Sequence, residues 1–379
     1  MTCKKIAFDA KRITHNATGL GNYGRTVVSN LAHFAPDNIY ELWTPDEGRA
    51  DLRNRLAGLP NIVFRYPRRP EHGIFKALWR SFGIAGELSD DTALFHGLSA
   101  ELPAGLRKKG IPSVVTVHDL IFLRFPQYYK TIDRWCYTLK YRKACRQADR
   151  IIAISEATKR DIIEFFGIAP EKIDVVYQGC DESFKKPVTE QQKELVRKKY
   201  SLPEHFILTV GSIEERKNLM AIVKAVELTG KELHIAAVGK RTPYTETVGK
   251  YAAEHGMSQR LHIVDNADFA DLPAIYRSAD LFIYPSRFEG FGIPIIEAAH
   301  CGVPTIAATG SCLEEAGGPT AAYCHPDDFA AMAAHIEKIL TDSQLRQRMI
   351  DGGRDYVRRF EPEILVADML SVYRKTTGE

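Results

Sequence analysis

Two acidic side chains stand on either side of a glycine-containing turn in the second half of the chain. Glu289 precedes the turn Gly-Phe-Gly-Ile-Pro, and Glu297 follows it. Pro294 suits the first position of a helix and Gly302 its end, which predicts Glu297 about one turn into that helix. Free N–H groups and partial positive charge at a helix N-terminus suit anionic or hydroxyl-rich ligands. The two acids can therefore hold two parts of a polyhydroxylated ligand; the alternative is an ordinary turn with Glu297 in solvent.

Two adjacent cations, Arg216 and Lys217, open a predicted helix after the apolar strand 206–210. Arginine can bind two phosphate oxygens at once, whereas lysine supplies a compact charge. Such a pair can neutralise a diphosphate when no metal is bound. The pattern therefore predicts a diphosphate site, with a solvated helix start as the alternative.

A histidine, His118, directly follows the apolar strand 113–117. Open α/β sheets bind ligands at the carboxyl ends of their parallel strands, which makes His118 a candidate for substrate contact. A buried structural histidine is the alternative. The sequence alone does not make His118 a general base, because that role depends on geometry.

A hexapeptide at residues 19–24 matches the pattern G-x-G-x-x-G. The dinucleotide fingerprint starts directly after a strand and has an acid about 20 residues later, at the end of the second strand. Here residues 10–18 intervene as a loop, and Glu41 opens the second strand. We therefore favour a glycine loop whose backbone approaches a ligand at the domain cleft, with NAD binding as the alternative.

Strands and helices alternate through both halves of the chain, which predicts an α/β fold of two doubly wound domains facing a cleft. Strands are predicted at residues 4–9, 40–43, 61–64, 93–96, 113–117, 150–154, 173–177, 206–210, 233–238, 261–264, 281–284, 303–307 and 321–324. The charged, proline-containing segment 182–203 indicates the junction between them. We place the first domain at 1–184 and the second at 185–360.

Composition sets limits on function. With 379 residues, of which 45% are hydrophobic, the chain can bury two cores. Its formal net charge of +3 gives no reason to expect nucleic acid as a partner. The seven cysteines are scattered without a C-x-x-C pair, as in reduced cytosolic proteins. No N-terminal signal is recognisable, and no segment approaches the roughly 20 apolar residues that span a bilayer.

The segment 74–82 has apolar residues at helical spacing with basic residues between them: Phe75, Lys76, Leu78, Trp79, Arg80 and Phe82. We favour a core-facing helix with a solvated basic side. The alternative is a surface that rests on anionic lipid or a lipid-linked acceptor. We accordingly expect a cytoplasmic protein, with peripheral contact to the inner face of the membrane as a further hypothesis.

The segment 286–304 reads S-R-F-E-G-F-G-I-P-x-x-E-A-A-x-C-G-x-P. It resembles the donor-site motif of family 4, a large family of retaining GT-B glycosyltransferases, and the resemblance extends over nearly the whole chain. It implies an N-terminal acceptor-side Rossmann-like domain and a C-terminal nucleotide-sugar-binding one, with the terminal helix 361–379 crossing back onto the first. It also implies transfer of a hexose from a nucleotide-diphosphate sugar with retention of configuration, without metal or other cofactor.

The resemblance assigns roles to individual residues. Arg216 and Lys217 would bind the donor diphosphate and Glu297 the ribose hydroxyls. Glu289 would hold the sugar hydroxyls, and His118 would face the transferred sugar. Catalysis is thus expected from Glu289, Lys217, Arg216 and His118. Further donor contacts are expected from Gly19, Gly21, Gly211, Ser212, Gly239, Phe291, Gly292 and Ile293. Many members have an arginine where this chain has Ser212, which leaves more of the diphosphate contact to Arg216.

The segments V-T-V-H-D-L-I-F-L-R-F-P and G-S-I-E-E-R-K-N-L are most similar to the mannosyltransferase-like branch of that family. This similarity favours GDP-mannose as the donor and a glycan or polyprenyl-linked glycan as the acceptor. Three alternatives stay open: a UDP-sugar-dependent transferase, a GT-B-type sugar-nucleotide 2-epimerase, and a non-catalytic nucleotide-sugar binding protein.

Overall fold

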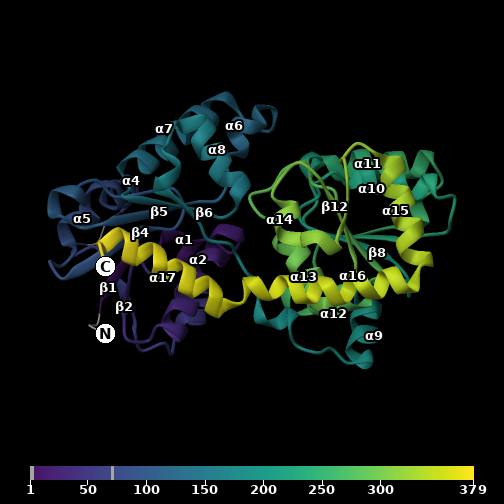
Figure 1. The fold of residues 1–379 in the computed structure, drawn as a ribbon, viewed down its shortest axis with the longest axis horizontal. Helices are drawn as coiled ribbons and strands as arrows, with labels where there is room; N and C mark the ends of the chain where they lie inside the picture. Colours follow the sequence, from purple (N-terminus) through teal and green to yellow (C-terminus); the bar gives the residue numbers. More distant parts are fainter. Residues whose placement is uncertain (1–3, 70–71) are drawn as a thin grey trace. The chain divides into compact units, whose positions relative to one another are not determined.

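The computed structural model describes residues 4–69 and 72–379 (Figure 1). The chain forms two compact units, the first comprising Met1–Gln178 and Glu361–Glu379 and the second Gly179–Phe360. Each unit has a parallel sheet packed between helices, which confirms the predicted α/β fold of two doubly wound domains.

The first unit contains seven parallel strands in the order β3-β2-β1-β4-β5-β6-β7. The strands are β1 (Lys5–Asp9), β2 (Ile39–Trp43), β3 (Ile62–Arg65), β4 (Thr92–Gly97), β5 (Ser113–Val117), β6 (Arg150–Ala153) and β7 (Ile173–Val175). The helices are α1 (Lys11–His15), α2 (Gly19–Phe34), α3 (Ala50–Arg53), α4 (Ile74–Leu78), the π-helical η2 (Trp79–Gly83), α5 (Ile84–Glu87), α6 (Ile121–Arg124), α7 (Thr131–Gln147), α8 (Glu156–Phe166) and α17 (Pro362–Thr377). Strand order reverses between β1 and β4.

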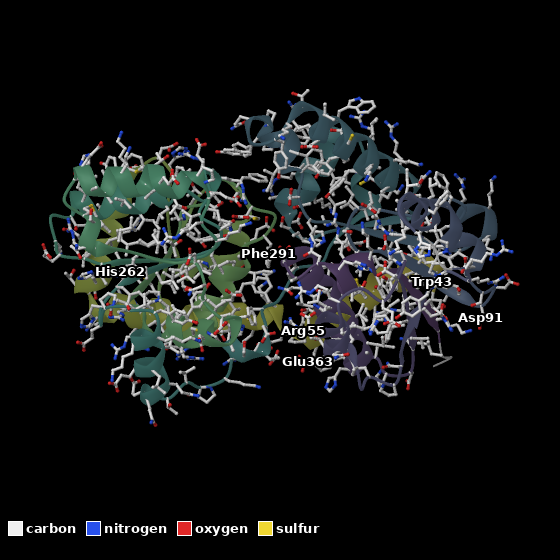
Figure 2. The ribbon with its side chains drawn as sticks, turned by 180° about the vertical axis from the view of Figure 1, so that it is seen from behind. Trp43, Arg55, Asp91, His262, Phe291 and Glu363 are labelled. Atoms are coloured by element: carbon white, nitrogen blue, oxygen red, sulfur yellow. The ribbon has the colours of Figure 1, made fainter. Side chains whose placement is uncertain are left out.

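The sheet of the first unit is buried on both faces. Ile6 and Phe8 of β1 pack in one core with residues of α2 and α17. Ala7 lies between them in the sequence and faces the opposite side, where it packs with Trp43 and Trp79 (Figure 2 labels Trp43). This alternation is the period of two that a strand imposes on its side chains.

The second unit contains six parallel strands in the order β10-β9-β8-β11-β12-β13. The strands are β8 (Ile207–Val210), β9 (Ile235–Val238), β10 (Leu261–Val264), β11 (Leu281–Tyr284), β12 (Thr305–Ala308) and β13 (Ala322–Cys324). The helices are α9 (Glu190–Lys199), α10 (Leu219–Leu228), α11 (Pro243–Glu254), α12 (Leu272–Ser278), α13 (Ile293–Cys301), α14 (Leu313–Gly317), α15 (Phe329–Thr341) and α16 (Ser343–Tyr356). Strand order reverses between β8 and β11.

The junction between the units lies at 178/179 rather than at 184/185. Phe184, which the sequence analysis assigned to the first domain, is fully buried in the second unit. Its ring packs edge-on against Tyr276 at 5.6 Å, and its carbonyl accepts a hydrogen bond from Arg277. Apolar packing therefore holds the turn before the charged segment to the second unit. Helix α17 packs within the first unit.

The hexapeptide at residues 19–24 is helical, which corrects the prediction of a glycine loop. Helix α2 begins at Gly19, and the short helix α1 occupies part of the predicted loop 10–18. Asn16 Oδ1 accepts hydrogen bonds from the backbone N–H and the hydroxyl of Thr18 at 2.6 and 2.7 Å, which orders the turn before α2. Glu41 is buried in the middle of β2 and pairs with Arg65 at 2.7 Å. Glu41 is thus not at the end of the second strand, where the dinucleotide fingerprint has its acid.

The segment 74–82 is not a core-facing helix, and this prediction is wrong. Phe75 and Phe82 are 58% and 64% exposed, whereas Trp79 is buried. The cations face the protein instead: Lys76 pairs with Asp46 at 2.6 Å. Acids on neighbouring segments pair with Lys76 and Arg80, so the basic side of this segment faces the protein and most of its apolar side faces solvent, the opposite of the prediction.

Candidate functional site

The reversal of strand order in the second unit brings two polar loops together. β8 and β11 pair in parallel, so their carboxyl ends lie at the same edge of the sheet. Arg216 and Lys217 follow β8 in the turn η7 (Glu215–Lys217), and Glu289 follows β11. Arg287 N donates to Arg216 O at 2.9 Å, which joins the two loops through their backbones. Ligands bind at such positions in open parallel sheets.

Glu289 Oε1 is the centre of a compact polar cluster. It lies 2.8 Å from Arg216 Nη1 and 3.3 Å from Lys217 Nζ. It also accepts hydrogen bonds from Ser286 Oγ at 2.8 Å and from Tyr284 OH at 3.0 Å. Tyr284 OH in turn accepts one from Lys217 Nζ at 2.8 Å. We call these five residues the Glu289 cluster.

Sequence reasoning found three members of the Glu289 cluster and missed Tyr284 and Ser286. One signal for Tyr284 is that it ends the otherwise apolar strand L-F-I-Y, so its hydroxyl reaches the carboxyl edge of the sheet. Ser286 stands three residues before Glu289, a spacing from which a hydroxyl can reach a carboxylate across a turn. Both hydroxyls add hydrogen bonds that buried charges need.

The charges in the cluster stabilise one another. Burial alone would raise the pKa of Glu289, but Lys217 and Arg216 lower it to about 2. Burial lowers the pKa of each cation, yet the carboxylate of Glu289 raises both above their usual values. All three groups are therefore ionised at neutral pH, and two positive charges face one negative charge.

Two glycines, Gly211 and Gly239, permit close packing of the turns around Lys217. Gly211 has φ of +137°, and a Cβ there would lie 2.7 Å from Lys217 Nζ. Gly239 has φ of +156°, and a Cβ there would lie 2.0 Å from Gly211 O. The turns after β8 and β9 thus approach through their backbones, which only glycine permits. Ser212 Oγ donates to Glu214 at 2.6 Å, so it braces the turn.

Glu297 lies on helix α13, after the turn that contains Glu289, and its environment differs from that of Glu289. Helix α13 begins at Ile293, with Gly292 as its N-cap, and ends at Cys301, with Gly302 as its C-cap. Pro294 is thus its second residue, one position later than predicted. Glu297 is buried and accepts a hydrogen bond from Tyr276 OH at 2.8 Å. Burial raises the pKa of Glu297 to about 7, with the hydrogen bond from Tyr276 opposing it. The two acids are therefore in different environments: Glu289 is paired with two cations, whereas burial dominates at Glu297 and the charge of Lys217 opposes it only in part.

The loop between Glu289 and Glu297 is held in place by packing and by contacts to its carbonyl groups. Phe291 is buried, and its ring lies 5.3 Å from that of Phe360 (Figure 2 labels Phe291). Cys312 Sγ contacts the carbonyl oxygens of Phe291 at 2.6 Å and Glu289 at 3.1 Å. A Cβ on Gly292 would lie 3.1 Å from Leu313, so the loop packs closely on α14.

The remaining predicted residues lie in the first unit. His118 is buried after β5, where Nε2 donates to Leu98 O at 2.9 Å and the Tyr23 ring packs edge-on at 4.6 Å. Burial lowers the pKa of His118 to about 4, so the ring is neutral at pH 7. Its Nδ1 is then an acceptor, and among the described residues no donor to it is present.

Gly19 and Gly21 differ in their surroundings. A Cβ on Gly21 would lie 1.8 Å from Asn16 O, so this glycine lets α2 pack against the preceding turn. Gly19 is exposed at the first position of α2. The predicted site residues are thus divided between the two units, and Gly21 has a packing reason of its own.

Two kinds of feature are absent from the described residues. Within 4–69 and 72–379, no group of three or more histidine, cysteine, aspartate or glutamate side chains is arranged to hold a metal ion. Over the same residues, no helix combines the length and the apolar character needed to cross a membrane.

Comparison with known proteins identifies two family profiles. "Glycosyltransferase Family 4" matches residues 25–184, and "Glycosyl transferases group 1" matches residues 191–356. The O-antigen chain mannosyltransferase B of Escherichia coli is 26% identical, covering 98% of this chain and 99% of that protein. The MMP alpha-(1->4)-mannosyltransferase of Mycolicibacterium hassiacum is 27% identical, covering 98% of both chains.

A solved structure has the same architecture. Anabaena Alr3699/HepE, crystallised in complex with UDP and glucose, superimposes with a TM-score of 0.77 at 16% identity, covering 98% of this chain and 100% of that chain. The two family profiles match most of the chain, one in each unit. The chain therefore belongs to family 4 of the glycosyltransferases, has the two-domain Rossmann-like GT-B fold, and resembles the mannosyltransferases of that family.

Proposed function

We propose that this glycosyltransferase transfers mannose from GDP-mannose to a glycan or lipid-linked glycan acceptor with retention of configuration. The Glu289 cluster carries the proposal, because it combines two cations with an acid at the point where strand order reverses. The names of the two mannosyltransferase relatives support the choice of sugar. A UDP-sugar donor remains the alternative that a binding experiment distinguishes.

Arg216 and Lys217 bind the donor diphosphate in this proposal. Their side chains are largely buried and already positioned by Glu289 and Tyr284. Positive charge that is fixed before the reaction stabilises negative charge developing on a leaving group without reorganisation. The proposal includes that Arg216 and Lys217 neutralise the diphosphate by themselves, so that the reaction needs no divalent cation.

The acids and the histidine bind the rest of the donor. Glu297 accepts hydrogen bonds from the ribose hydroxyls, and Glu289 from the hydroxyls of the transferred sugar. His118 offers its Nδ1 as an acceptor to a sugar hydroxyl. The first turn of α13 supplies N–H groups at Gly292 and Ile293, of the kind that helices leave without intrahelical partners.

The reaction proceeds on one face of the sugar. The bond from the anomeric carbon to the diphosphate oxygen breaks, and a bond to the acceptor oxygen forms on the same side. The acceptor hydroxyl proton passes to the departing diphosphate. Glu289 is not a nucleophile in this scheme, because Oε1 is engaged by Arg216, Ser286 and Tyr284.

An exposed apolar surface supports peripheral contact with an anionic membrane. Ile74, Phe75, Leu78 and Phe82 are all exposed on α4 and η2. Exposed cations on neighbouring turns are Arg68, Arg69, Arg107 and Lys108. The N–H of Arg68 donates to Glu87 Oε2 and the N–H of Ala104 to Ser81 O, which ties these turns to the same region. Apolar side chains beside basic ones are typical of membrane-surface contacts.

Proton NMR of the product tests the reaction. The protein is incubated with GDP-mannose, or with UDP-glucose, and methyl α-mannoside as a simple acceptor. An α-linked mannoside from GDP-mannose is expected. A β-linked product would overturn retention, and turnover of UDP-glucose alone would establish the alternative donor.

A further inference from the structure

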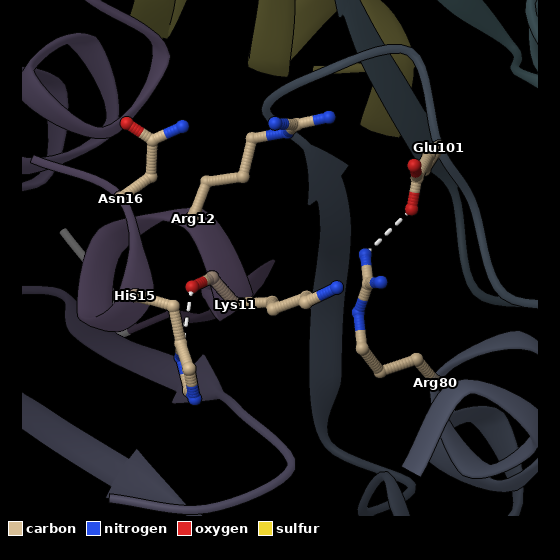
Figure 3. A pocket seen from close by; sticks show the side chains of 6 residues that line it. All are labelled: Lys11, Arg12, His15, Asn16, Arg80 and Glu101. Carbon is tan, nitrogen blue, oxygen red and sulfur yellow. Dashed lines mark hydrogen bonds and ion pairs between the residues drawn. The ribbon is translucent and has the colours of Figure 1, made fainter. Parts of the chain in front are cut away.

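A cavity of about 210 Å³ lies in the first unit (Figure 3). It is lined by Lys11, Arg12, His15, Asn16, Arg80 and Glu101. The first four follow β1, and Glu101 follows β4. These strands are where the strand order of this sheet reverses, which is the position at which open parallel sheets bind ligands.

Some charges of the cavity are compensated within the protein. Arg80 pairs with Asp9 and with Glu101, at 2.5 Å in each case. His15 pairs with Asp46 at 2.8 Å. These contacts fix the walls of the cavity, and they leave the guanidinium of Arg80 with two carboxylate partners.

Lys11 and Arg12 are different, because neither has a carboxylate partner in the described part of the chain. Arg12 Nε donates to Ser99 Oγ at 3.1 Å, which orients the guanidinium and leaves its two terminal nitrogens for a ligand. Figure 3 shows both side chains extending into the cavity. An oriented guanidinium beside a compact ammonium is suited to phosphate oxygens.

The cavity is close to His118. Leu98 and Ser99 are neighbours in the loop after β4: Leu98 O accepts from His118 Nε2, and Ser99 Oγ accepts from Arg12 Nε. After burial, the positive charge of Arg12 contributes to lowering the pKa of His118. Arg12 therefore lies beside the residue proposed to face the transferred sugar.

We propose that Lys11 and Arg12 form an anion subsite that binds a phosphate or diphosphate group of the acceptor. This inference rests on the proposed function, in which the donor diphosphate has its own cations at Arg216 and Lys217. Lys11 and Arg12 are a second pair of cations, without a carboxylate partner in the described residues and beside the predicted sugar contact, and they serve the other substrate. A sugar phosphate and a lipid-diphosphate-linked glycan share the chemistry that this subsite recognises.

Calorimetric titration with inorganic phosphate and pyrophosphate at low ionic strength tests the subsite. The full chain is used with Lys217→Ala, so that the donor site contributes little. Pyrophosphate or phosphate is expected to bind, and Lys11→Gln with Arg12→Gln to raise the Kd at least about tenfold. The matched control is Lys143→Gln with Arg146→Gln, two exposed cations of α7. No binding, or equal Kd values in the two double variants, would overturn the subsite; unfolding temperatures verify that each variant is folded.

Phosphate, pyrophosphate and GDP together distinguish a phosphomonoester acceptor, a diphosphate-linked acceptor and the donor as the ligand of this subsite. Tighter binding of phosphate supports a phosphomonoester acceptor, and tighter binding of pyrophosphate supports a diphosphate-linked one. Arg12→Gln with Lys217 intact is expected to bind GDP as the parent does. A tenfold loss of GDP affinity in Arg12→Gln would assign the cavity to the donor and overturn the acceptor role. Failure of the proposed function would instead appear as no GDP or UDP binding to the parent.

Discussion

Arg216 Nη1 lies 2.8 Å from Glu289 Oε1, although the two residues follow different strands of the sheet. Lys217 Nζ lies 3.3 Å from the same oxygen. One carboxylate thus compensates two buried cations and holds both at the carboxyl edge of β8 and β11. Removing one partner of a buried charge pair leaves the other uncompensated, so a change at one of these residues should lower stability as well as alter ligand binding.

Replacing Glu289 by glutamine separates diphosphate binding from sugar transfer. The variant keeps the shape of the side chain but removes a negative charge beside Arg216 and Lys217. Free nucleoside diphosphate should bind at least as tightly as to the parent, while turnover falls by about a hundredfold. Calorimetry and a transfer assay on the same preparation measure both effects. Glu246→Gln, at an exposed acid of α11, is the control, and near-parental turnover of Glu289→Gln would refute its role.

Adding a methyl group at Gly211 should displace Lys217. A Cβ there would lie 2.7 Å from Lys217 Nζ, and the backbone φ of +137° strains any side chain. We expect Gly211→Ala to weaken nucleoside diphosphate binding by about tenfold and to lower thermal stability. Gly249→Ala in α11 is the control, because open space surrounds that position. Unchanged nucleotide affinity in Gly211→Ala would show that Lys217 does not need this space.

The pH dependence of stability reports on Glu297. Burial raises its pKa to about 7 from an ordinary value of 4.5. The folded protein therefore holds a proton that the unfolded chain releases, and Glu297 makes stability fall as pH rises from 4.5 to 7. Glu297→Gln should remove this contribution, so that its unfolding temperature exceeds that of the parent by more at pH 8 than at pH 5.

The same variant should lose nucleotide affinity, because an amide is a weaker acceptor for the ribose hydroxyls than a carboxylate. We expect about a tenfold increase in Kd for the nucleoside diphosphate at pH 8. Gains in stability together with losses in binding are typical of functional sites. A variant with the parental pH profile and the parental affinity would contradict both roles of Glu297.

The exposed apolar surface of α4 and η2 predicts binding to anionic lipid. Phe75→Ser with Phe82→Ser should reduce co-sedimentation with phosphatidylglycerol vesicles severalfold, because these rings are the apolar part of the contact. Leu195→Ser with Leu228→Ser removes equally exposed apolar residues of the second unit and should have no effect. A parent protein that does not sediment with the vesicles would remove the membrane hypothesis.

Local patterns predicted the framework of the fold and the charged members of the site. The strand–helix alternation predicted both sheets, and the flanking glycine and cations indicated Arg216 and Lys217. Pairing of β8 with β11 then joins these cations to Glu289, a relation between segments about 70 residues apart that spacing along the chain does not contain. Tyr284 and Ser286 contact Glu289 locally, through hydrogen bonds across five and three residues, and β8–β11 pairing adds the contact of Tyr284 with Lys217.

Two of the predictions that the structure corrects failed because tertiary contacts override local patterns. The glycines of 19–24 suggested a loop, but Asn16 orders the turn before Thr18, and Gly21 lets the helix pack on that turn. The spacing of Phe75 and Phe82 suggested a buried face. Acids on other segments instead hold Lys76 and Arg80 toward the protein, which exposes the aromatic side. Neither contact is visible from helical periodicity.

Calorimetric titration of the parent and of Lys217→Ala with GDP, UDP, ADP and NAD, without added metal, tests the central claim most directly. The Glu289 cluster predicts that GDP binds the parent and that Lys217→Ala weakens this binding at least about thirtyfold, the effect of removing a buried charge partner. Lys250→Ala, at an exposed lysine of α11, should bind GDP as the parent does. Equal GDP affinity in Lys217→Ala and the parent, or binding of NAD alone, would contradict the assignment of this cluster to a nucleotide-sugar diphosphate.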